Sequence, residues 1–169
     1  MKRLWAPWRM PYLLNEDEKP EGCIFCHKAE RSDEEEHILY RGEHVFVALN
    51  RYPYSNGHML VIPYRHTSRL EALDDSTLLE MMQITRCTLR ILRAVYQPQG
   101  FNVGINEGEA AGAGVAEHLH LHIVPRWNHD ANYMTVIGET RVLPEMLDET
   151  YRIFRPRFDR LEALSEEVD

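Results

Sequence analysis

At 169 residues with a formal net charge of −8, the chain is long enough to bury one hydrophobic core without disulfide bonds. Its 44% hydrophobic and 27% charged residues are ordinary for a globular protein, and no apolar run approaches the roughly 20 residues of a membrane span. The negative charge would repel a polyanion, so we expect one domain without nucleic acid or membrane partners, in which a local pocket can still bind a small anion.

The N-terminal segment begins with positive charge, but Pro7, Arg9 and Pro11 interrupt the roughly 7–15 apolar residues that a signal peptide needs. Three cysteines, two of them within the sequence CIFC, suit a reducing compartment better than a secreted disulfide framework. We therefore expect a cytoplasmic protein. Residues 1–36 are interpreted as an N-terminal extension that forms a loop over residues 15–36, tethered at the cysteine pair.

Three short segments rich in β-branched and aromatic residues follow, at residues 37–41, 44–50 and 58–64. An Arg-Gly-Glu break at Gly42 and a turn that ends at Gly57 separate them. This pattern predicts an antiparallel meander of three strands.

The sequence between residues 73 and 100 has the three- and four-residue spacing of one helix face, which predicts a single long helix. The positions that define this face are Leu78, Met82, Thr85, Leu89, Leu92 and Tyr96. Asp74 or Asp75 can cap the start of the helix. Thr77 with Glu80 resembles a capping box.

Residues 101–106 and 118–126 predict a fourth and a fifth strand, joined by the glycine-rich residues 107–114. Because this connection is short, the two strands should be antiparallel neighbours. Residues 144–164 have a helical pattern, which Pro156 should kink or divide. The fold class is therefore α+β: an antiparallel five-stranded sheet with one long helix and a C-terminal helix packed on it.

Three histidines, His118, His120 and His122, alternate with apolar residues in the fifth predicted strand. Alternate side chains of a strand share one face and lie roughly 6.6 Å apart, so the three imidazoles should project together. Such a row can be a transition-metal site, can supply a nucleophile toward phosphorus, or can be three partly exposed surface residues. The glycines of residues 107–114 would let backbone amides approach a phosphate, and Asn106 adds a side-chain amide, so phosphate chemistry is favoured.

Cys23 and Cys26 have the spacing of metal ligands, but one pair is half of a structural zinc site, which has four ligands. His27 is a rival ligand, although adjacent residues rarely reach the same ion. A thioredoxin-like redox motif is an alternative, and it expects a preceding strand that the acidic flank does not offer. Unliganded cysteines are the third possibility. Cys87, in the long helix, is expected to be a packing residue.

The histidine row resembles the histidine triad (HIT) superfamily of nucleotide hydrolases and transferases, whose motif His-φ-His-φ-His-φ-φ is matched at every position from His118 to Val124. The similarity extends along nearly the whole chain, through the segments RLWAPWRMPYL, ALNRYPYSNGHMLVIPYRH, GFNVGIN and DANYMTVIGETRVLP. These segments look like the bacterial diadenosine tetraphosphate phosphorylase branch. The resemblance implies a HIT-like fold for residues 1–169 as a single domain, with a core at residues 37–126 and a C-terminal helical segment at residues 127–169.

A nucleotidyl-histidine mechanism is implied by the same resemblance. His120 would attack the α-phosphorus as a neutral imidazole, with its Nδ1–H held by the backbone carbonyl of His118. His122 would stabilise the charge that develops on the phosphate. His58 matches a family histidine that lies near the triad, and we expect it to support catalysis.

Substrate contacts are also implied by the resemblance. Asn50 is at the position of a residue that binds ribose hydroxyls, although on sequence alone it would be a turn residue. Asn106 and the amides near Gly112 and Gly114 should hold phosphate. Many relatives carry Ser, Thr or Gln just before the triad, where this chain has Gly and Val, so backbone amides or Arg126 would have to contact the leaving group.

A subset of bacterial relatives has the same cysteine pair and completes a zinc site with two histidines. The corresponding ligands here are Cys23, Cys26, His66 and His118. A structural zinc ion would tether the N-terminal extension to the catalytic strand and leave His118 without a catalytic role. No organic cofactor is expected.

The expected reaction is phosphorolysis of diadenosine tetraphosphate to ADP and ATP by inorganic phosphate. Three alternatives remain: a hydrolase that releases AMP from dinucleoside polyphosphates or nucleoside phosphoramidates, a non-catalytic nucleotide-binding module, and a metal-dependent enzyme with all three histidines as ligands. Relatives are commonly homodimers, and the resemblance implies the same here.

Overall fold

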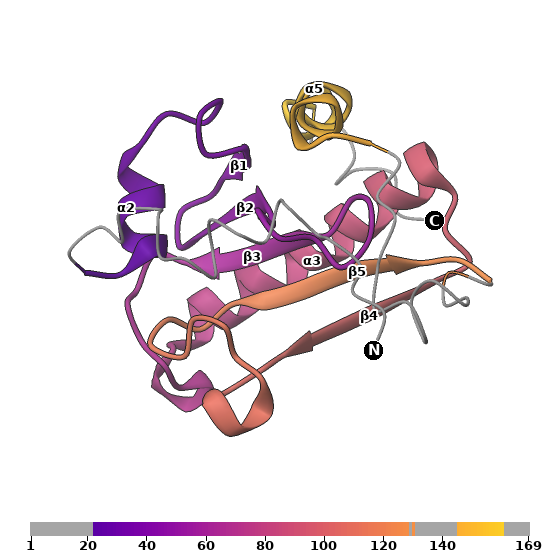
Figure 1. Cartoon of the computed structure of the whole chain (residues 1–169). Helices are drawn as coiled ribbons and strands as arrows, with labels where there is room; N and C mark the ends of the chain where they lie inside the picture. Colours follow the sequence, from indigo (N-terminus) through magenta and orange to yellow (C-terminus); the bar gives the residue numbers. More distant parts are fainter. Residues whose placement is uncertain (1–21, 129, 131–144, 161–169) are drawn as a thin grey trace, which may run out of the picture.

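The computed structural model describes residues 22–128, 130 and 145–160, and its centre is a five-stranded sheet (Figure 1). The strands are β1 (Ile38–Arg41), β2 (Val45–Leu49), β3 (Met59–Pro63), β4 (Gly100–Ile105) and β5 (Leu121–Arg126). Their order across the sheet is β1-β2-β3-β5-β4, and every neighbouring pair is antiparallel. The predicted meander and the predicted pairing of the last two strands are therefore confirmed.

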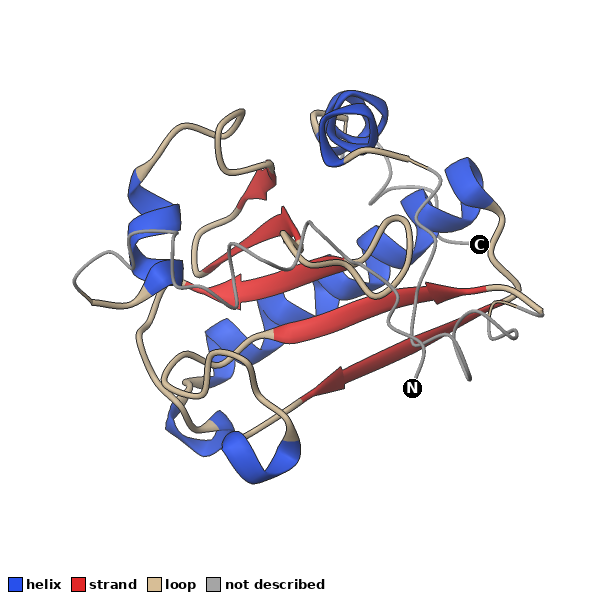
Figure 2. Cartoon of the chain, viewed as in Figure 1, coloured by secondary structure: helices blue, strands red, loops and turns tan. Residues whose placement is uncertain are grey.

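Three α-helices accompany the sheet in the described ranges, together with 3-10 helices at Leu70–Ala72 and Glu109–Ala111. The long helix α3 (Asp75–Tyr96) crosses one face of the sheet, against β2, β3 and β5 (Figures 1 and 2). Helix α5 (Leu147–Phe158) packs beside β1 and α3. The α+β prediction is confirmed. None of the helices in these ranges is both long and apolar enough to cross a membrane.

Helix α2 (Ile24–Glu30) corrects the prediction of a loop over residues 15–36. The segment is polar in composition, and its apolar anchors are the buried Phe25 and the buried Cys23 at its N-cap. A seven-residue helix is not stable in water by itself, so tertiary packing of these anchors must hold it. Sequence periodicity could not detect it, because one turn of apolar contact is too short to make a pattern. The first 21 residues lie outside the described residues.

Apolar side chains fill both faces of the sheet. The helix-side cluster, between the sheet and helices α3 and α5, consists of Leu39, Val45, Val47, Leu49, Met59, Val61, Leu73, Met81, Ile84, Cys87, Ile91, Leu92, Leu119, Leu121, Ile123, Phe154 and Phe158. The site-side cluster, on the opposite face, consists of Cys23, Phe25, Ile38, Phe46, Ala48, Leu60 and Ile62. Successive residues of β2 and β3 alternate between the two clusters, as strand geometry requires. The histidine row and α2 therefore belong to the face that α3 does not cover.

The predicted buried face of α3 is confirmed except at Met82. Thr85 and Leu92 are buried, and Leu78, Leu89 and Tyr96 pack against the helix-side cluster. Met82 is 58% exposed, so its assignment to this face is wrong. The face is also wider than predicted, because it includes the buried residues Met81, Ile84, Thr88 and Ile91. Cys87 is buried in the helix-side cluster, as predicted.

Asp74 is the N-cap of α3, as predicted, and its carboxylate accepts a hydrogen bond from the Thr77 amide at 2.8 Å. The predicted capping box is wrong, because the Glu80 carboxylate accepts from the amides of Glu43 at 2.9 Å and His44 at 2.7 Å. Glu80 thus ties α3 to the tight turn between β1 and β2.

Gly42 in that turn leads to a stability prediction. A Cβ atom built there would overlap Glu80 Oε1. Gly42→Ala should therefore displace a carboxylate that satisfies two backbone amides, lowering the free energy of unfolding by about 1–3 kcal/mol. Thermal unfolding measures this, with Gly100→Ala as the matched control, since a Cβ at Gly100 meets nothing within 4 Å. An equal effect of both changes would contradict the role given to Glu80.

Pro156 lies inside α5 and does not divide it, so of the predicted kink or division the division is wrong. The helix continues to Phe158, because Phe154 and Phe158 are both buried and hold the last turn on either side of the proline. The predicted start of this helix at residue 144 lies outside the described residues.

Candidate active site and metal site

The histidine row faces the site side of the sheet, but only its last member lies in β5. The strand begins at Leu121, after His118 and His120. The ladder between β3 and β5 does not extend to Pro63, because Pro63 has no amide hydrogen to donate. The carbonyl of Pro63 instead accepts a hydrogen bond from His118 Nε2 at 2.9 Å. The alternation nevertheless continues: the residues between the histidines belong to the helix-side cluster. His118, His120 and His122 are all buried, so the alternative of a partly exposed surface row is wrong.

Hydrogen bonding fixes the tautomer of His120. Its Nδ1 lies 2.8 Å from the backbone oxygen of His118, and because a carbonyl can only accept, Nδ1 must carry the proton. Nε2 therefore holds a lone pair. This is the bond that the family resemblance implied, and it leaves His120 as a neutral imidazole with an available nucleophilic nitrogen.

A second chain of hydrogen bonds fixes His58 and His122. The Tyr54 amide donates to His58 Nδ1 at 3.0 Å, so the proton of His58 is on Nε2. That N–H lies 2.9 Å from His122 Nδ1, which must accept it, and the proton of His122 is therefore on Nε2. Among the described residues this buried Nε2–H has no hydrogen-bond partner. A buried donor without a partner is costly in a stable fold and points to a ligand acceptor.

Burial keeps the three histidines neutral. Desolvation lowers the pKa of His118 and His120 below the ordinary histidine value. It also lowers the pKa of His122 to about 4, with a further contribution from the neighbouring His120. The row is therefore uncharged at pH 7, as required for one imidazole to act as a nucleophile and others to act as metal ligand or hydrogen-bond donor.

The low pKa of His122 makes stability depend on pH. The unfolded chain protonates this histidine near its ordinary value of about 6.5, whereas the folded chain resists protonation down to about 4. Between these values the unfolded state binds more protons, so the stability contributed by neutral His122 is present above about pH 6.5 and is lost as the pH falls toward 4. Thermal unfolding between pH 7 and 4 should show this slope, and His122→Asn should reduce it. An unchanged slope in the variant would contradict the assignment.

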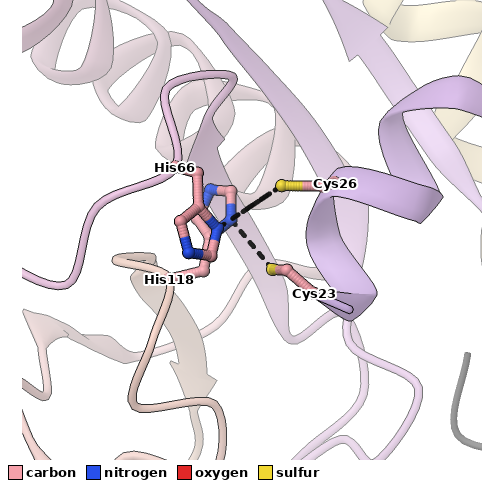
Figure 3. A group of neighbouring side chains, drawn as sticks. All are labelled: Cys23, Cys26, His66 and His118. Carbon is pink, nitrogen blue, oxygen red and sulfur yellow. Dashed lines mark hydrogen bonds between the residues drawn. The ribbon is translucent and has the colours of Figure 1, made fainter. Parts of the chain in front are cut away.

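Two cysteines and one further histidine lie next to His118, the first histidine of the row (Figure 3). The ligand atoms of Cys23, Cys26, His66 and His118 all lie within 4.8 Å of one another. Cys23 Sγ is 3.1 Å from His118 Nδ1, and Cys26 Sγ is 3.4 Å from His66 Nδ1 and 3.7 Å from His118 Nδ1. Ligands at roughly 2.0–2.3 Å from a tetrahedral zinc ion lie about 3.3–3.8 Å apart, so these separations suit that ion.

The tautomer of His118 is also the one that a zinc ligand needs. Its Nε2 donates to the Pro63 carbonyl, so its Nδ1 carries the lone pair that faces the two sulfur atoms. All four residues predicted as ligands are brought together, and His27 is not part of this group. His118 thus serves two purposes, since its ring faces the sulfurs and its carbonyl orients His120. An all-histidine metal site is unsupported, because the ligand nitrogen of His118 faces the two sulfur atoms and the remaining nitrogen of His122 carries its proton.

The predicted substrate contacts fall around this face. Asn50 follows β2, where its side-chain oxygen accepts from the Tyr52 amide at 3.0 Å and its Nδ2 lies 3.3 Å from His58 Nδ1. Asn106 follows directly after the pair of Ile105 with Leu121, at the end of the sheet where His120 lies. Neither contact pattern tests the ribose and phosphate roles, which stay predictions.

Glycines of β4 and of the connection between β4 and β5 lie next to the histidine row. Gly104 pairs with His122 across the β4–β5 ladder, and a Cβ there would meet none of the described residues within 4 Å, so no described side chain covers the sheet beside His122. Within the same described ranges, a Cβ at Gly112 or Gly114 would also meet nothing within 4 Å. The Gly112 amide, however, donates to the Glu109 carbonyl at 2.9 Å, which leaves the amide of Gly114 as the better candidate for phosphate.

The hydrogen bonds of Arg126 count against the expected contact with the leaving group. It lies four residues beyond His122, roughly 13 Å along the strand. Its guanidinium donates to Asp130 at 2.5 Å and 2.8 Å and to Asn102 at 2.7 Å. These bonds tie the far end of β5 to its neighbours, so Arg126 has a structural role.

Two aromatic residues at the site were missed by sequence reasoning. The Phe25 ring packs on both His118 and His120, with centroids 5.5 Å and 4.9 Å apart. The Tyr54 ring stacks on His122 at 5.9 Å and an interplanar angle of 17°. An aromatic residue between two metal-ligating cysteines was the one available signal for Phe25.

Known proteins resemble this chain over most of its length. A family model described as the HIT domain matches residues 31–129. A Mycobacterium tuberculosis protein named AP-4-A phosphorylase is 42% identical over 167 residues, which cover 95% of this chain and 86% of that protein. The crystal structure of a Zn-bound histidine triad family protein from Mycobacterium smegmatis is 30% identical, with a TM-score of 0.67 over 85% of this chain and 97% of that one. The crystal structure of a hypothetical histidine triad nucleotide-binding protein from Sulfolobus tokodaii is 26% identical in sequence, with a TM-score of 0.65 over 86% of this chain and 96% of that one.

Proposed function

The chain belongs to the HIT domain family, and on this premise we propose that it is an enzyme that cleaves dinucleoside polyphosphates through a nucleotidyl-histidine intermediate on His120. The observation that carries the proposal is a pair of ring nitrogens on one face: the Nε2 lone pair of His120 and the buried Nε2–H of His122, which lacks a partner among the described residues. The two ring centroids are 4.7 Å apart. One phosphate group can therefore meet a nucleophile and a hydrogen-bond donor together.

In the first step, the Nε2 lone pair of His120 attacks the α-phosphorus of diadenosine tetraphosphate. A P–N bond forms, and the P–O bond to the ATP leaving group breaks. His122 donates its Nε2–H to a phosphate oxygen, where negative charge develops, and His58 holds His122 in the tautomer that can do so. None of the described residues lies within 4 Å of a Cβ at Gly104, which supports a place for the phosphate chain there.

In the second step, an oxygen of inorganic phosphate attacks the adenylyl phosphorus. The P–N bond breaks and its electron pair returns to His120, which gives ADP beside the ATP already released. The AP-4-A phosphorylase from M. tuberculosis supports phosphate as the acceptor. We assign Asn50 to the ribose, and Asn106 with the amide of Gly114 to phosphate.

We further propose that Cys23, Cys26, His66 and His118 bind zinc. Both the donor set and its spacing suit zinc, and the Zn-bound structure from M. smegmatis supports it. The ion would supply structural cross-linking between α2 and the residues before β5. The ring of His118 would bind the metal and take no direct part in the nucleotidyl transfer.

Product analysis tests the function. Purified zinc-loaded protein is incubated with diadenosine tetraphosphate, with and without inorganic phosphate, and the nucleotides are separated by chromatography. The proposal expects ADP plus ATP only when phosphate is present. AMP plus ATP regardless of phosphate would instead identify a hydrolase. Binding without turnover of this substrate or of a nucleoside phosphoramidate would identify a nucleotide-binding module.

We also propose a cytoplasmic homodimer. β4 is an edge strand whose residues Asn102, Val103 and Gly104 are exposed, which leaves a strand edge that a second copy could extend. Light scattering at working concentration is expected to give twice the monomer mass of 19.9 kDa. A monomer would refute this part of the proposal.

A further inference from the structure

Phe25 connects the metal-binding residues to the nucleophile. It stands between Cys23 and Cys26 in the sequence, on the first turn of α2, and is 5% exposed. Its ring centroid lies 4.9 Å from that of His120 and 5.5 Å from that of His118. One ring therefore contacts both the imidazole proposed to attack phosphorus and an imidazole proposed to bind zinc.

This ring lies at the end of α2 that is next to the two cysteines. Helix α2 has only seven residues, so tertiary contacts must hold it in place. Arg41 ties the C-terminal end of α2 to β1 by donating to the carbonyls of Ala29 at 2.6 Å and Arg31 at 2.8 Å, whereas the N-cap has no side-chain hydrogen bond. The cysteines that flank Phe25 point at His66 and His118, which come from two other parts of the chain (Figure 3). A metal ion held by these four residues would fix α2, and with it the Phe25 ring, against the sheet.

The orientation of His120 needs such support. Nδ1 is held by the His118 carbonyl, but one hydrogen bond leaves the ring free to tilt about that axis. Two other rings pack against the His120 ring: His122, with centroids 4.7 Å apart and an interplanar angle of 63°, and Phe25, with centroids 4.9 Å apart and an angle of 58°. Of these two rings, Phe25 is the one that comes from α2, so its removal would give the imidazole more room to tilt toward α2.

We infer that Phe25 is a positioning residue for His120, and that the metal site acts on the transfer reaction through it. This inference rests on the proposed function, in which His120 is the nucleophile. It assigns the metal site an effect on rate in addition to its effect on stability. It also explains in physical terms why a structural metal would be built two residues from the nucleophile.

A four-way comparison tests the inference: the wild type and Phe25→Leu, each with zinc and after zinc removal, with kcat, KM and zinc content measured for all. Leucine keeps an apolar side chain and removes the ring. We expect zinc-loaded Phe25→Leu to bind one equivalent of zinc and to lose about 10- to 100-fold in kcat with little change in KM, since small misplacements of a reacting group have effects of this size. Zinc removal should cost the wild type a similar factor in kcat and cost the variant much less.

The matched control is Phe46→Leu, the same substitution in the same site-side cluster, at a ring that packs on Tyr64 instead of the histidines. It should leave kcat near the wild-type value. An equal loss of kcat in Phe46→Leu and Phe25→Leu, or an equal effect of zinc removal on the wild type and on Phe25→Leu, would overturn the inference.

A readout without substrate separates this inference from the proposed function. In protein labelled with ¹⁵N-histidine, the His120 ring of the zinc-loaded wild type should give one sharp Nδ1–H signal. Phe25→Leu and zinc removal should each shift or broaden it, and Phe46→Leu should not. If the wild type turns over no dinucleoside polyphosphate, the proposed function fails while this signal still reports on the positioning. An unchanged signal in Phe25→Leu would overturn the positioning itself.

Discussion

Replacing His120 with alanine should abolish turnover while the protein keeps its fold and its metal. The imidazole supplies the electron pair that forms the P–N bond, and no other described group can replace it, because His122 Nδ1 accepts from His58 and His118 Nδ1 faces the two sulfur atoms. Loss of a catalytic nucleophile lowers kcat by about 10⁴-fold or more. Steady-state kinetics on diadenosine tetraphosphate measure the loss of turnover, and metal analysis of the same samples measures the retained metal.

His44→Ala is the matched control for this experiment. His44 lies just before β2, half-buried, and its contacts with Glu80 use the backbone amide rather than the ring. Its removal should leave turnover near the wild-type level. If His120→Ala lost metal together with activity, His120 would be a metal ligand. The assignment of His118 as metal ligand, His120 as nucleophile and His122 as hydrogen-bond donor would then be wrong.

Cys23→Ser should remove the bound zinc and lower the thermal unfolding temperature by roughly 10 °C. Cys23 is buried, and its Sγ lies 3.1 Å from His118 Nδ1, so it belongs to the enclosed part of the cluster. Loss of a structural metal is among the few single-site changes that cost more than about 4 kcal/mol. For a chain of this length each kcal/mol corresponds to about 2–4 °C.

Cys87→Ala provides the comparison, because Cys87 is also buried but lies in the helix-side cluster, away from the four ligands. It should keep one equivalent of zinc. Metal content by mass spectrometry and unfolding by calorimetry distinguish the two variants. Full zinc content in Cys23→Ser would exclude that residue as a ligand.

The sheet and the long helix could be predicted because their signals are local. β2 and β3 are continuous apolar runs bounded by turn residues. The three histidines alternate with apolar residues, which is the pattern of a strand with two different faces. The metal ligands could be assigned only through resemblance to a family, since Cys26 and His66 are 40 residues apart in sequence and nothing local relates them. The register of β3 and β5 places His118 beside Pro63 at the end of β3, three residues before His66, and the packing of α2 adds the two cysteines.

Other features needed the tertiary structure. Helix α2 has too little apolar periodicity to be recognised, and its place depends on packing of Phe25 against residues almost 100 positions away. The tautomers of His58 and His122 follow from an amide at Tyr54 and from a hydrogen bond across the sheet, neither of which a sequence pattern encodes. Arg126 was misjudged because nearness in sequence to the triad says nothing about its partners Asp130 and Asn102.

The most direct test of the account is to look for the covalent intermediate. Zinc-loaded protein is mixed with diadenosine tetraphosphate in the absence of phosphate, quenched in alkaline denaturant to preserve the P–N bond, digested and analysed by mass spectrometry. We predict one adenylyl group on the peptide that contains His120, with fragmentation that places the group on that residue. When phosphate is added before the quench, the adenylyl group should leave the protein as ADP. Turnover to ADP and ATP with no adduct at any time, or with an adduct on another residue, would contradict it.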